Sequence, residues 1–364
     1  MLLEMLGDGF FRQIIFRAVL AAIMAFLMSI LLGPRLISYL KKKKIGEKVE
    51  KSDSPRLDSI MSGKKDTPTM GGVFVCLAIV FGILICGNFN NPVTYLLLFT
   101  VVALCLVGGY DDYLKLSGKS KKGMTLWVKL LCQMAIGLGA GIFLMIILRD
   151  KDPKWATHLY FPVFGDGVDL GTYGYPFFVM FIIVSCSNAV NITDGLDGLA
   201  AGCLVIATLA FAIIAYTAGR IDFTKYLDIP YLRTSAEVTV FATTMLGACI
   251  GLLWFNCYPA QVFMGDSGSL PLGGAIGLIA CVTKQELLIL LVGGVFVIEV
   301  LSSLLQILSF RLFGKRRIFL IAPLHHHYQF KGMSETKITL RFWIVAAILA
   351  LASLATLTLR LLDK

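Results

Sequence analysis

Charged residues and histidines are scarce in this sequence. Only 15% of its 364 residues are charged and 57% are hydrophobic, with four histidines in all. A soluble domain has about 25% charged residues. Apolar runs of roughly the length that spans a bilayer, about 17–25 residues, recur along the chain. The composition therefore excludes an ordinary soluble domain and predicts a polytopic membrane protein.

Several familiar signatures are also missing. No Cys-x-x-Cys pair occurs among the nine cysteines, most of which lie inside apolar runs. We interpret them as small buried hydrophobic residues, neither metal ligands nor disulfide partners. No P-loop or dinucleotide fingerprint occurs. No cleavable signal peptide is evident, because Glu4 and Asp8 precede the first apolar run, so we expect the first helix to be retained.

Ten apolar segments are candidates for crossing a membrane. They are predicted at residues 17–40, 71–88, 93–110, 126–148, 176–190, 199–218, 238–255, 268–282, 286–310 and 340–361. These segments must be helices, because backbone groups in lipid have to be satisfied internally. We therefore expect an all-α polytopic integral membrane protein with about ten transmembrane helices, in one transmembrane domain over residues 1–364.

Lys and Arg are unevenly distributed between the loops. They concentrate after odd-numbered helices, above all in loops 33–70 and 311–339. Positively charged loops stay in the cytoplasm, so this excess predicts that these loops are cytoplasmic and that both termini are extracytoplasmic. The net charge of +10 is then explained by these loops and by anionic lipid, not by nucleic acid.

Five unusual polar clusters fall on the predicted cytoplasmic face. They are Lys64–Gly72, Gly108–Tyr113, Asn188–Gly198, Asn256–Ser269 and Ala322–His327. Their position on one face predicts a single composite site made by cytoplasmic loops. Within the third cluster, Asp194 and Asp197 would share a face of a helical turn. Their oxygen atoms suit Mg²⁺, which usually also binds substrate phosphates.

The acidic residues of two clusters also have plain structural interpretations. Asp111 and Asp112 could simply end a helix in water. On a helix they point about 100° apart, which favours different roles for the two residues. One Asp would take part in metal or base chemistry, and the other would hold a Lys or a substrate group. Asp266 could be an ordinary N-cap. Equally, the helix that follows Asp266 could bind a phosphate at its N-terminus.

Three of the four histidines are consecutive: His325, His326 and His327. They do not form the i,i+4 zinc pattern, and Mg²⁺ prefers oxygen. They better suit hydrogen bonds to phosphate or help with a proton, although a chance polar turn remains open. Glu299 and Gln306 are seven residues apart, so we expect both on one helix face toward the bundle interior.

The sequence resembles the phospho-N-acetylmuramoyl-pentapeptide transferases, within the polyprenyl-phosphate N-acetylhexosamine-1-phosphate transferase superfamily. The resemblance covers essentially the whole chain. It rests on Thr67–Gly72, Asp111–Tyr113, Asn188–Ala200, Leu253–Asn256, Tyr258–Asp266, Gly293–Glu299, Ala322–Tyr328 and, in an outer loop, Ile229–Arg233. The triple histidine after Ala-Pro-Leu points to this family within the superfamily. Tyr110 and Ser267 depart from the residues common in the family.

The resemblance implies a reaction and its site. Undecaprenyl phosphate attacks the β-phosphate of UDP-N-acetylmuramoyl-pentapeptide, giving lipid I and UMP with Mg²⁺ as cofactor, in peptidoglycan synthesis at the cytoplasmic face of the bacterial inner membrane. It implies Asp266 as the magnesium ligand, Asp111 and Asp112 as base and organiser, and His325 as a further catalytic residue. The implied substrate-binding residues are Lys64, Thr69, Asn188, Asn191, Asp194, Asp197, Asn256, Phe263, Ser269, Gln306, His326 and His327. A homodimer is left open.

Two further hypotheses stay open. A sister transferase that uses a UDP-N-acetylhexosamine would share the aspartate clusters but lack the triple histidine. An ion-coupled transporter would need acidic residues in the middle of its helices, and only Glu299 clearly fits that description. For the transferase we expect direct in-line attack by the lipid phosphate, which is already largely ionised because the second pKa of a monoester is about 6.

Overall fold

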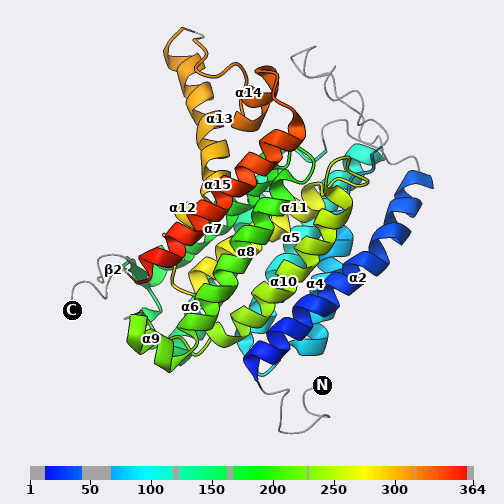
Figure 1. Cartoon of the computed structure of the whole chain (residues 1–364). Helices are drawn as coiled ribbons and strands as arrows, with labels where there is room; N and C mark the ends of the chain where they lie inside the picture. The colour runs from blue at the N-terminus through cyan, green and yellow to red at the C-terminus, as the bar shows by residue number, and fades with distance from the viewer. Residues whose placement is uncertain are drawn as a thin grey trace.

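The structure, a computed structural model, describes residues 13–42, 67–117, 123–161, 167–227, 229–314 and 316–358. Long helices run side by side in one bundle (Figure 1). Within the described ranges, eight helices are long and apolar enough to cross a membrane. The prediction of an all-α polytopic membrane protein is confirmed.

The ten predicted segments all correspond to helices. The eight long ones are α2 (Ile14–Lys42), α5 (Pro92–Leu116), α6 (Leu126–Lys151), α7 (Gly171–Thr193), α8 (Leu199–Ala218), α10 (Ser235–Asn256), α13 (Gly294–Leu312) and α15 (Glu335–Thr356). Two shorter apolar helices are α4 (Gly72–Cys86) and α11 (Asp266–Val282). Short elements connect them: η3 (Pro153–Trp155), α9 (Ile221–Leu227), α12 (Ile289–Val292), α14 (Leu324–Phe330) and the antiparallel hairpin of β1 (His158–Tyr160) and β2 (Gly167–Asp169).

One predicted span is wrong in its detail. The single helix expected at 286–310 is instead two helices, α12 and α13, separated at Gly293. The chain leaves α11 through Lys284, whose φ of 54° is left-handed. Residues 283–285 follow the eighth predicted segment and so belong to a loop on the predicted extracytoplasmic side. The Lys284 side chain is nevertheless fully buried, with Nζ 3.3 Å from Glu286 Oε1 and 3.8 Å from the centre of the Tyr175 ring. These partners compensate a charge that burial would otherwise make costly.

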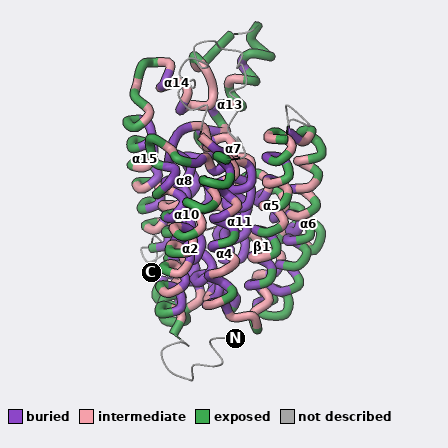
Figure 2. Tube along the Cα trace, turned by 90° about the vertical axis from the view of Figure 1, so that its right-hand side faces the viewer, coloured by how far each residue is buried: buried purple, intermediate pink, exposed green. Residues whose placement is uncertain are grey.

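The centre of the bundle is α11. All of its residues are buried, and Figure 2 shows this buried interior surrounded by more exposed outer helices. Glycines on neighbouring helices allow very close approach to its start. A Cβ at Gly72 of α4 would lie 2.0 Å from Gly268 N, and one at Gly108 of α5 would lie 2.0 Å from the Asp266 carbonyl oxygen. This packing brings α4 and α5 against the first turn of α11.

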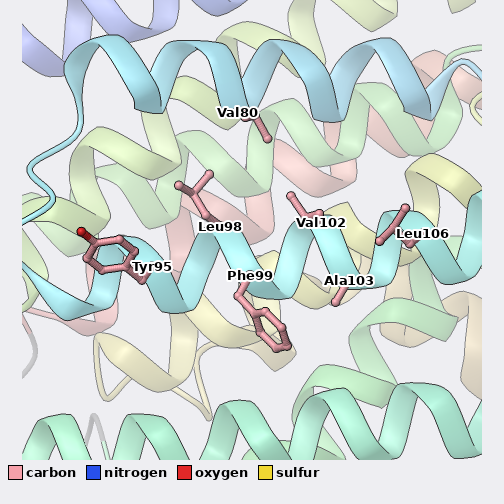
Figure 3. Close-up of a pocket in the computed structure, with 7 residues that line it drawn as sticks. All are labelled: Val80, Tyr95, Leu98, Phe99, Val102, Ala103 and Leu106. Atoms are coloured by element: carbon pink, nitrogen blue, oxygen red, sulfur yellow. The ribbon is translucent and has the colours of Figure 1, made fainter. Parts of the chain in front are cut away.

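The outer faces of the bundle are apolar, as contact with lipid requires. Figure 3 shows one shallow groove on such a face, lined by Val80 of α4 and by six residues of α5: Tyr95, Leu98, Phe99, Val102, Ala103 and Leu106. Three of its lining residues, Tyr95, Phe99 and Leu106, are more than half exposed. Asp111 and Asp112 on the same helix are buried, so the groove and the aspartates occupy different faces of α5.

Candidate active site

The segment before α4 pairs with the segment before α11. The backbone N–H groups of Gly71–Gly72 donate to the carbonyls of Phe263–Met264, each at 2.8 Å. Gly265 then turns the chain into α11 with a φ of 70°. A Cβ at Gly265 would lie 2.7 Å from the Thr69 hydroxyl oxygen. The first and fourth predicted clusters are therefore in contact.

Asp112 holds the start of α11 from α5. Its Oδ1 accepts from the Asp266 N–H at 3.2 Å and its Oδ2 from the Ser267 N–H at 2.9 Å. Both N–H groups belong to the first turn of a helix and have no acceptor within it. The interpretation of Asp266 as the N-cap is wrong, because Gly265 occupies that position. Since Asp112 uses these two N–H groups, they are not free to bind a phosphate.

Asp111 and Asp266 share two lysines. Lys115 Nζ lies 2.9 Å from Asp111 Oδ2 and 2.6 Å from Asp266 Oδ2. Lys129 Nζ, from α6, lies 3.5 Å and 2.9 Å from the same two atoms. The other Asp111 oxygen accepts from the Met124 N–H at 2.6 Å. Two buried carboxylates are thus held side by side by two ammonium groups.

Sequence reasoning did not select these lysines for the site. Lys115 follows Asp111 by four residues, a spacing that places the two side chains on one helix face and could have identified it. Lys129 has no such local signal, because it reaches the aspartates from a different helix. Only the packing of α6 beside α5 brings it there.

The atoms around Asp266 suit a hard cation. Asp266 Oδ1 accepts from the Asn191 side-chain amide, which also donates to Ser269 Oγ at 2.8 Å. Oδ2 of Asp266 and Oδ2 of Asp111 already lie against two positive charges. Carboxylate oxygens are ligands that Mg²⁺ prefers, whereas the Asn191 amide presents its N–H groups here and can only orient the Asp266 carboxylate. In the described residues no group of three or more His, Cys, Asp or Glu side chains could hold a metal ion.

The turn 194–198 joins α7 to α8 beside this group. Gly198, with a φ of 72°, donates its N–H to Asn256 Oδ1 at 3.1 Å. The Asn256 amide in turn donates to the Val262 carbonyl at 2.9 Å. Asp197 is 4% exposed, whereas Asp194 is partly exposed at the end of α7. The third and fourth clusters are therefore in contact as well.

His325 is buried against that turn. Its Nδ1 lies 3.0 Å from Glu299 Oε2, and its backbone N–H donates to Glu299 Oε1 at 3.1 Å. A Cβ at Gly195 would lie 2.3 Å from His325 Nε2, so only glycine leaves room for the ring. Glu299 faces the interior, as predicted, and fixes the ring that packs on Gly195.

The other two histidines make local contacts. His326 Nδ1 lies 2.8 Å from Gln329 Oε1. His327 Nδ1 accepts from the Leu320 N–H at 3.1 Å, which requires an unprotonated nitrogen. Burial, reinforced by the charge of Lys331, lowers the pKa of His327 and so favours that neutral form. Both side chains belong to the α14 segment at the upper end of the bundle in Figure 1.

Some predicted site residues have other partners or cannot be placed. The Gln306 amide binds the backbone of 318–319, accepting from both N–H groups and donating to the Phe319 carbonyl. The Asn188 amide donates to Gln133 Oε1 and to a carbonyl of its own helix, both at 2.8 Å. Phe263 is partly buried, and its backbone pairs with the segment before α4. Lys64 lies outside the described residues.

The chain matches a transferase class. Residues 94–284 match the family model described as glycosyl transferase family 4. The chain, a helical bundle whose buried carboxylates Asp111 and Asp266 are paired with two lysines, is thus a member of that transferase class. Residues 64–76 match a second model, described as phospho-N-acetylmuramoyl-pentapeptide-transferase signature 1.

Curated relatives identify the family more narrowly. The chain is 44% identical over 351 residues to the phospho-N-acetylmuramoyl-pentapeptide-transferase of Oleidesulfovibrio alaskensis, covering 96% of this chain and 95% of the relative. It is 44% identical over 355 residues to that of Desulfotalea psychrophila, covering 97% and 96%. It is 41% identical over 354 residues to that of Methylacidiphilum infernorum, covering 96% and 95%. The chain belongs to the phospho-N-acetylmuramoyl-pentapeptide-transferase family, a family of bacterial membrane phosphotransferases, which confirms the resemblance found in its motifs.

Proposed function

We propose that this chain transfers phospho-N-acetylmuramoyl-pentapeptide from its UDP-linked precursor to undecaprenyl phosphate, giving lipid I and UMP. The observation that carries the proposal is the junction of α5, α6 and α11, where Asp111 and Asp266 meet Lys115 and Lys129. Phosphoryl transfer requires mainly positioning and charge neutralisation, which this junction can supply.

Asp266 is the residue that would hold a magnesium ion, with Asp111 beside it. When bound, Mg²⁺ would neutralise charge on the diphosphate and help to align it. The arrangement fits such an ion because the carboxylate oxygens already attract two ammonium groups. Asn191 would fix the orientation of the Asp266 carboxylate through its amide.

The two lysines would bind phosphate oxygens of the substrate. Lys115 Nζ is held by side-chain carboxylates alone, and its side chain is 41% exposed, so it can move to a substrate. Lys129 is less exposed, at 18%, and would keep its place near Asp266. When Lys115 moves from Asp111 to the substrate, the Asp111 carboxylate would become free to align the attacking lipid phosphate or to accept its proton.

The nucleotide would lie beside the turn 194–198, where Asn191, Asp194 and Asp197 are candidates for contact. In this arrangement Asp112 organises the site without touching substrate, because it holds the first turn of α11. A cytosolic nucleotide and a lipid nucleophile can meet only at the inner membrane surface, which favours a site that faces the cytoplasm.

The decisive test is release of UMP from the purified full-length chain in detergent. We expect release that depends on UDP-N-acetylmuramoyl-pentapeptide, undecaprenyl phosphate and Mg²⁺ together. UDP-N-acetylglucosamine is the matched control, because a sister transferase would accept it. Release of UMP from UDP-N-acetylglucosamine but not from UDP-N-acetylmuramoyl-pentapeptide would refute the proposed substrate. The transporter alternative gains no support, since Glu299, its best candidate acid, is hydrogen-bonded to His325.

A further inference from the structure

Three side chains of α15 bind the backbone of the turn between α7 and α8. Glu335 Oε1 accepts from the Asp197 N–H at 2.7 Å. Thr339 Oγ1 donates to the Asp197 carbonyl at 3.2 Å, and Trp343 Nε1 donates to the Gly198 carbonyl at 3.2 Å. The three side chains are spaced by four residues, so they form one stripe along α15. We refer to Glu335, Thr339 and Trp343 as the α15 stripe.

The dipeptide Asp197–Gly198 has its conformation imposed from outside. The α15 stripe binds the N–H and the carbonyl of Asp197 and the carbonyl of Gly198, and Asn256 of α10 accepts from the remaining N–H. The Gly198 carbonyl also accepts from the Gly202 N–H of α8 at 2.9 Å. All four backbone polar groups therefore bind side chains from other helices. Buried backbone groups must be paired, so a change in this turn would leave some of them without partners.

Glycines make room for the stripe. Gly198 adopts the left-handed backbone that a side chain would strain. A Cβ at Gly202 of α8 would lie 2.1 Å from the Trp343 ring, so only glycine there allows the indole to reach the turn. The sequence thus provides both a flexible turn and the space for a rigid support.

The opposite side of the turn is supported too. Asp197 Oδ2 accepts from the Ala260 N–H at 3.0 Å, and the His325 ring packs on Gly195. The turn is therefore held between α15 on one side and the α14 segment and the loop before α11 on the other. Its geometry determines where Asp194 and Asp197 point.

We propose that the α15 stripe is a positioning element for the nucleotide. It sets the conformation of the turn 194–198 and thereby the affinity for the uridine nucleotide, without touching the ligand. This inference rests on the proposed function, in which that turn lines the nucleotide pocket. The stripe has no role in the attack of the lipid phosphate.

The experiment measures UMP binding by calorimetry, with Mg²⁺ present, on the full-length chain in detergent. Glu335→Ala removes the acceptor for the Asp197 N–H, and Trp343→Phe removes the indole N–H while keeping an aromatic ring beside Gly202. We expect the Kd for UMP to rise up to about tenfold in each, as expected for a lost, partly buried hydrogen bond. The KM for the UDP substrate should rise in parallel, while the KM for undecaprenyl phosphate stays within about twofold.

Two controls separate positioning from general stability. Glu335→Gln keeps an oxygen that can accept the same N–H, so it should bind UMP nearly as wild type does. Thr336→Val changes an exposed neighbour on α15 and should have no effect. Wild-type UMP affinity in both Glu335→Ala and Trp343→Phe would overturn the inference, as would equal KM increases for both substrates. A wild-type chain that releases no UMP refutes the proposed function itself, and the inference with it. Normal UMP release by the wild-type chain, together with unchanged UMP affinity in Glu335→Ala and Trp343→Phe, refutes only the positioning role of the α15 stripe.

Discussion

Asp112 of α5 accepts a hydrogen bond from the backbone N–H of Ser267 at 2.9 Å and so caps α11 from a neighbouring helix. Its other oxygen binds the N–H of Asp266. The adjacent Asp111 points instead to lysines. The two neighbouring aspartates therefore have different partners, and the position of Asp266 depends on Asp112.

Removal of that cap should destabilise the protein. Asp112→Ala leaves two buried N–H groups without acceptors, which costs about 1–3 kcal/mol for each group. We expect a lower thermal unfolding midpoint together with loss of UMP release, because Asp266 would no longer be held in place. Asp150→Asn is a control, since the Asp150 side chain is 69% exposed. An unfolding midpoint of Asp112→Ala equal to that of the wild type would show that the cap does not contribute to stability.

Asp266→Asn should abolish turnover while the protein stays folded. The substitution removes the charge that attracts Mg²⁺ and leaves the shape of the side chain unchanged, so we expect UMP release to fall by at least about a hundredfold. Mg²⁺ binding should weaken in parallel, as a titration of UMP release against Mg²⁺ would measure. Asp222→Asn serves as the control, because the Asp222 side chain is 88% exposed. Full recovery at high Mg²⁺ would mean that Asp266 contributes less than we propose.

A methyl group at Gly195 should disturb the site through His325. In Gly195→Ala the new Cβ would lie 2.3 Å from His325 Nε2, and overpacking of this kind costs about 1–3 kcal/mol. We expect a lower unfolding midpoint and slower UMP release. Gly139→Ala is a matched control, since a Cβ there would have no neighbour within 4 Å.

The double variant Gly195→Ala/His325→Ala tests whether the contact itself is responsible. Removal of the ring relieves the clash, so the stability loss of the double variant should be smaller than the sum of the two single losses. Strictly additive losses would show that the two residues act independently. The same thermal unfolding measurement decides between these results.

The sequence predicted the helices and the clusters better than the contacts between helices. Hydropathy placed all ten segments, and α8 has the bounds expected for it. Hydropathy could not show the break at Gly293, because both sides of the break are apolar. Helical spacing relates residues of one helix, so it could indicate Lys115 from Asp111. It could not indicate Lys129 or the α15 stripe, whose partners are on other helices.

The route of phosphoryl transfer can be decided by omission of the lipid. In a covalent route an aspartate would attack the β-phosphate, release UMP and pass the phospho-sugar to the lipid. Asp111 Oδ1 accepts from the Met124 N–H and Oδ2 is paired with two lysines, so this carboxylate would have to lose a lysine before it could attack phosphorus. The lipid phosphate is already largely ionised and needs no protein nucleophile, and a loose transition state gains most from positioning.

We therefore expect direct attack, with Asp111 as the base that assists the lipid phosphate. The measurement is incubation of the chain with labelled UDP-N-acetylmuramoyl-pentapeptide and Mg²⁺ after all polyprenyl phosphate has been removed. No burst of UMP should appear, because the nucleophile is missing, and addition of undecaprenyl phosphate should start release. A stoichiometric burst of UMP, with label retained on the protein and lost in Asp111→Asn, would instead establish a covalent intermediate on that carboxylate.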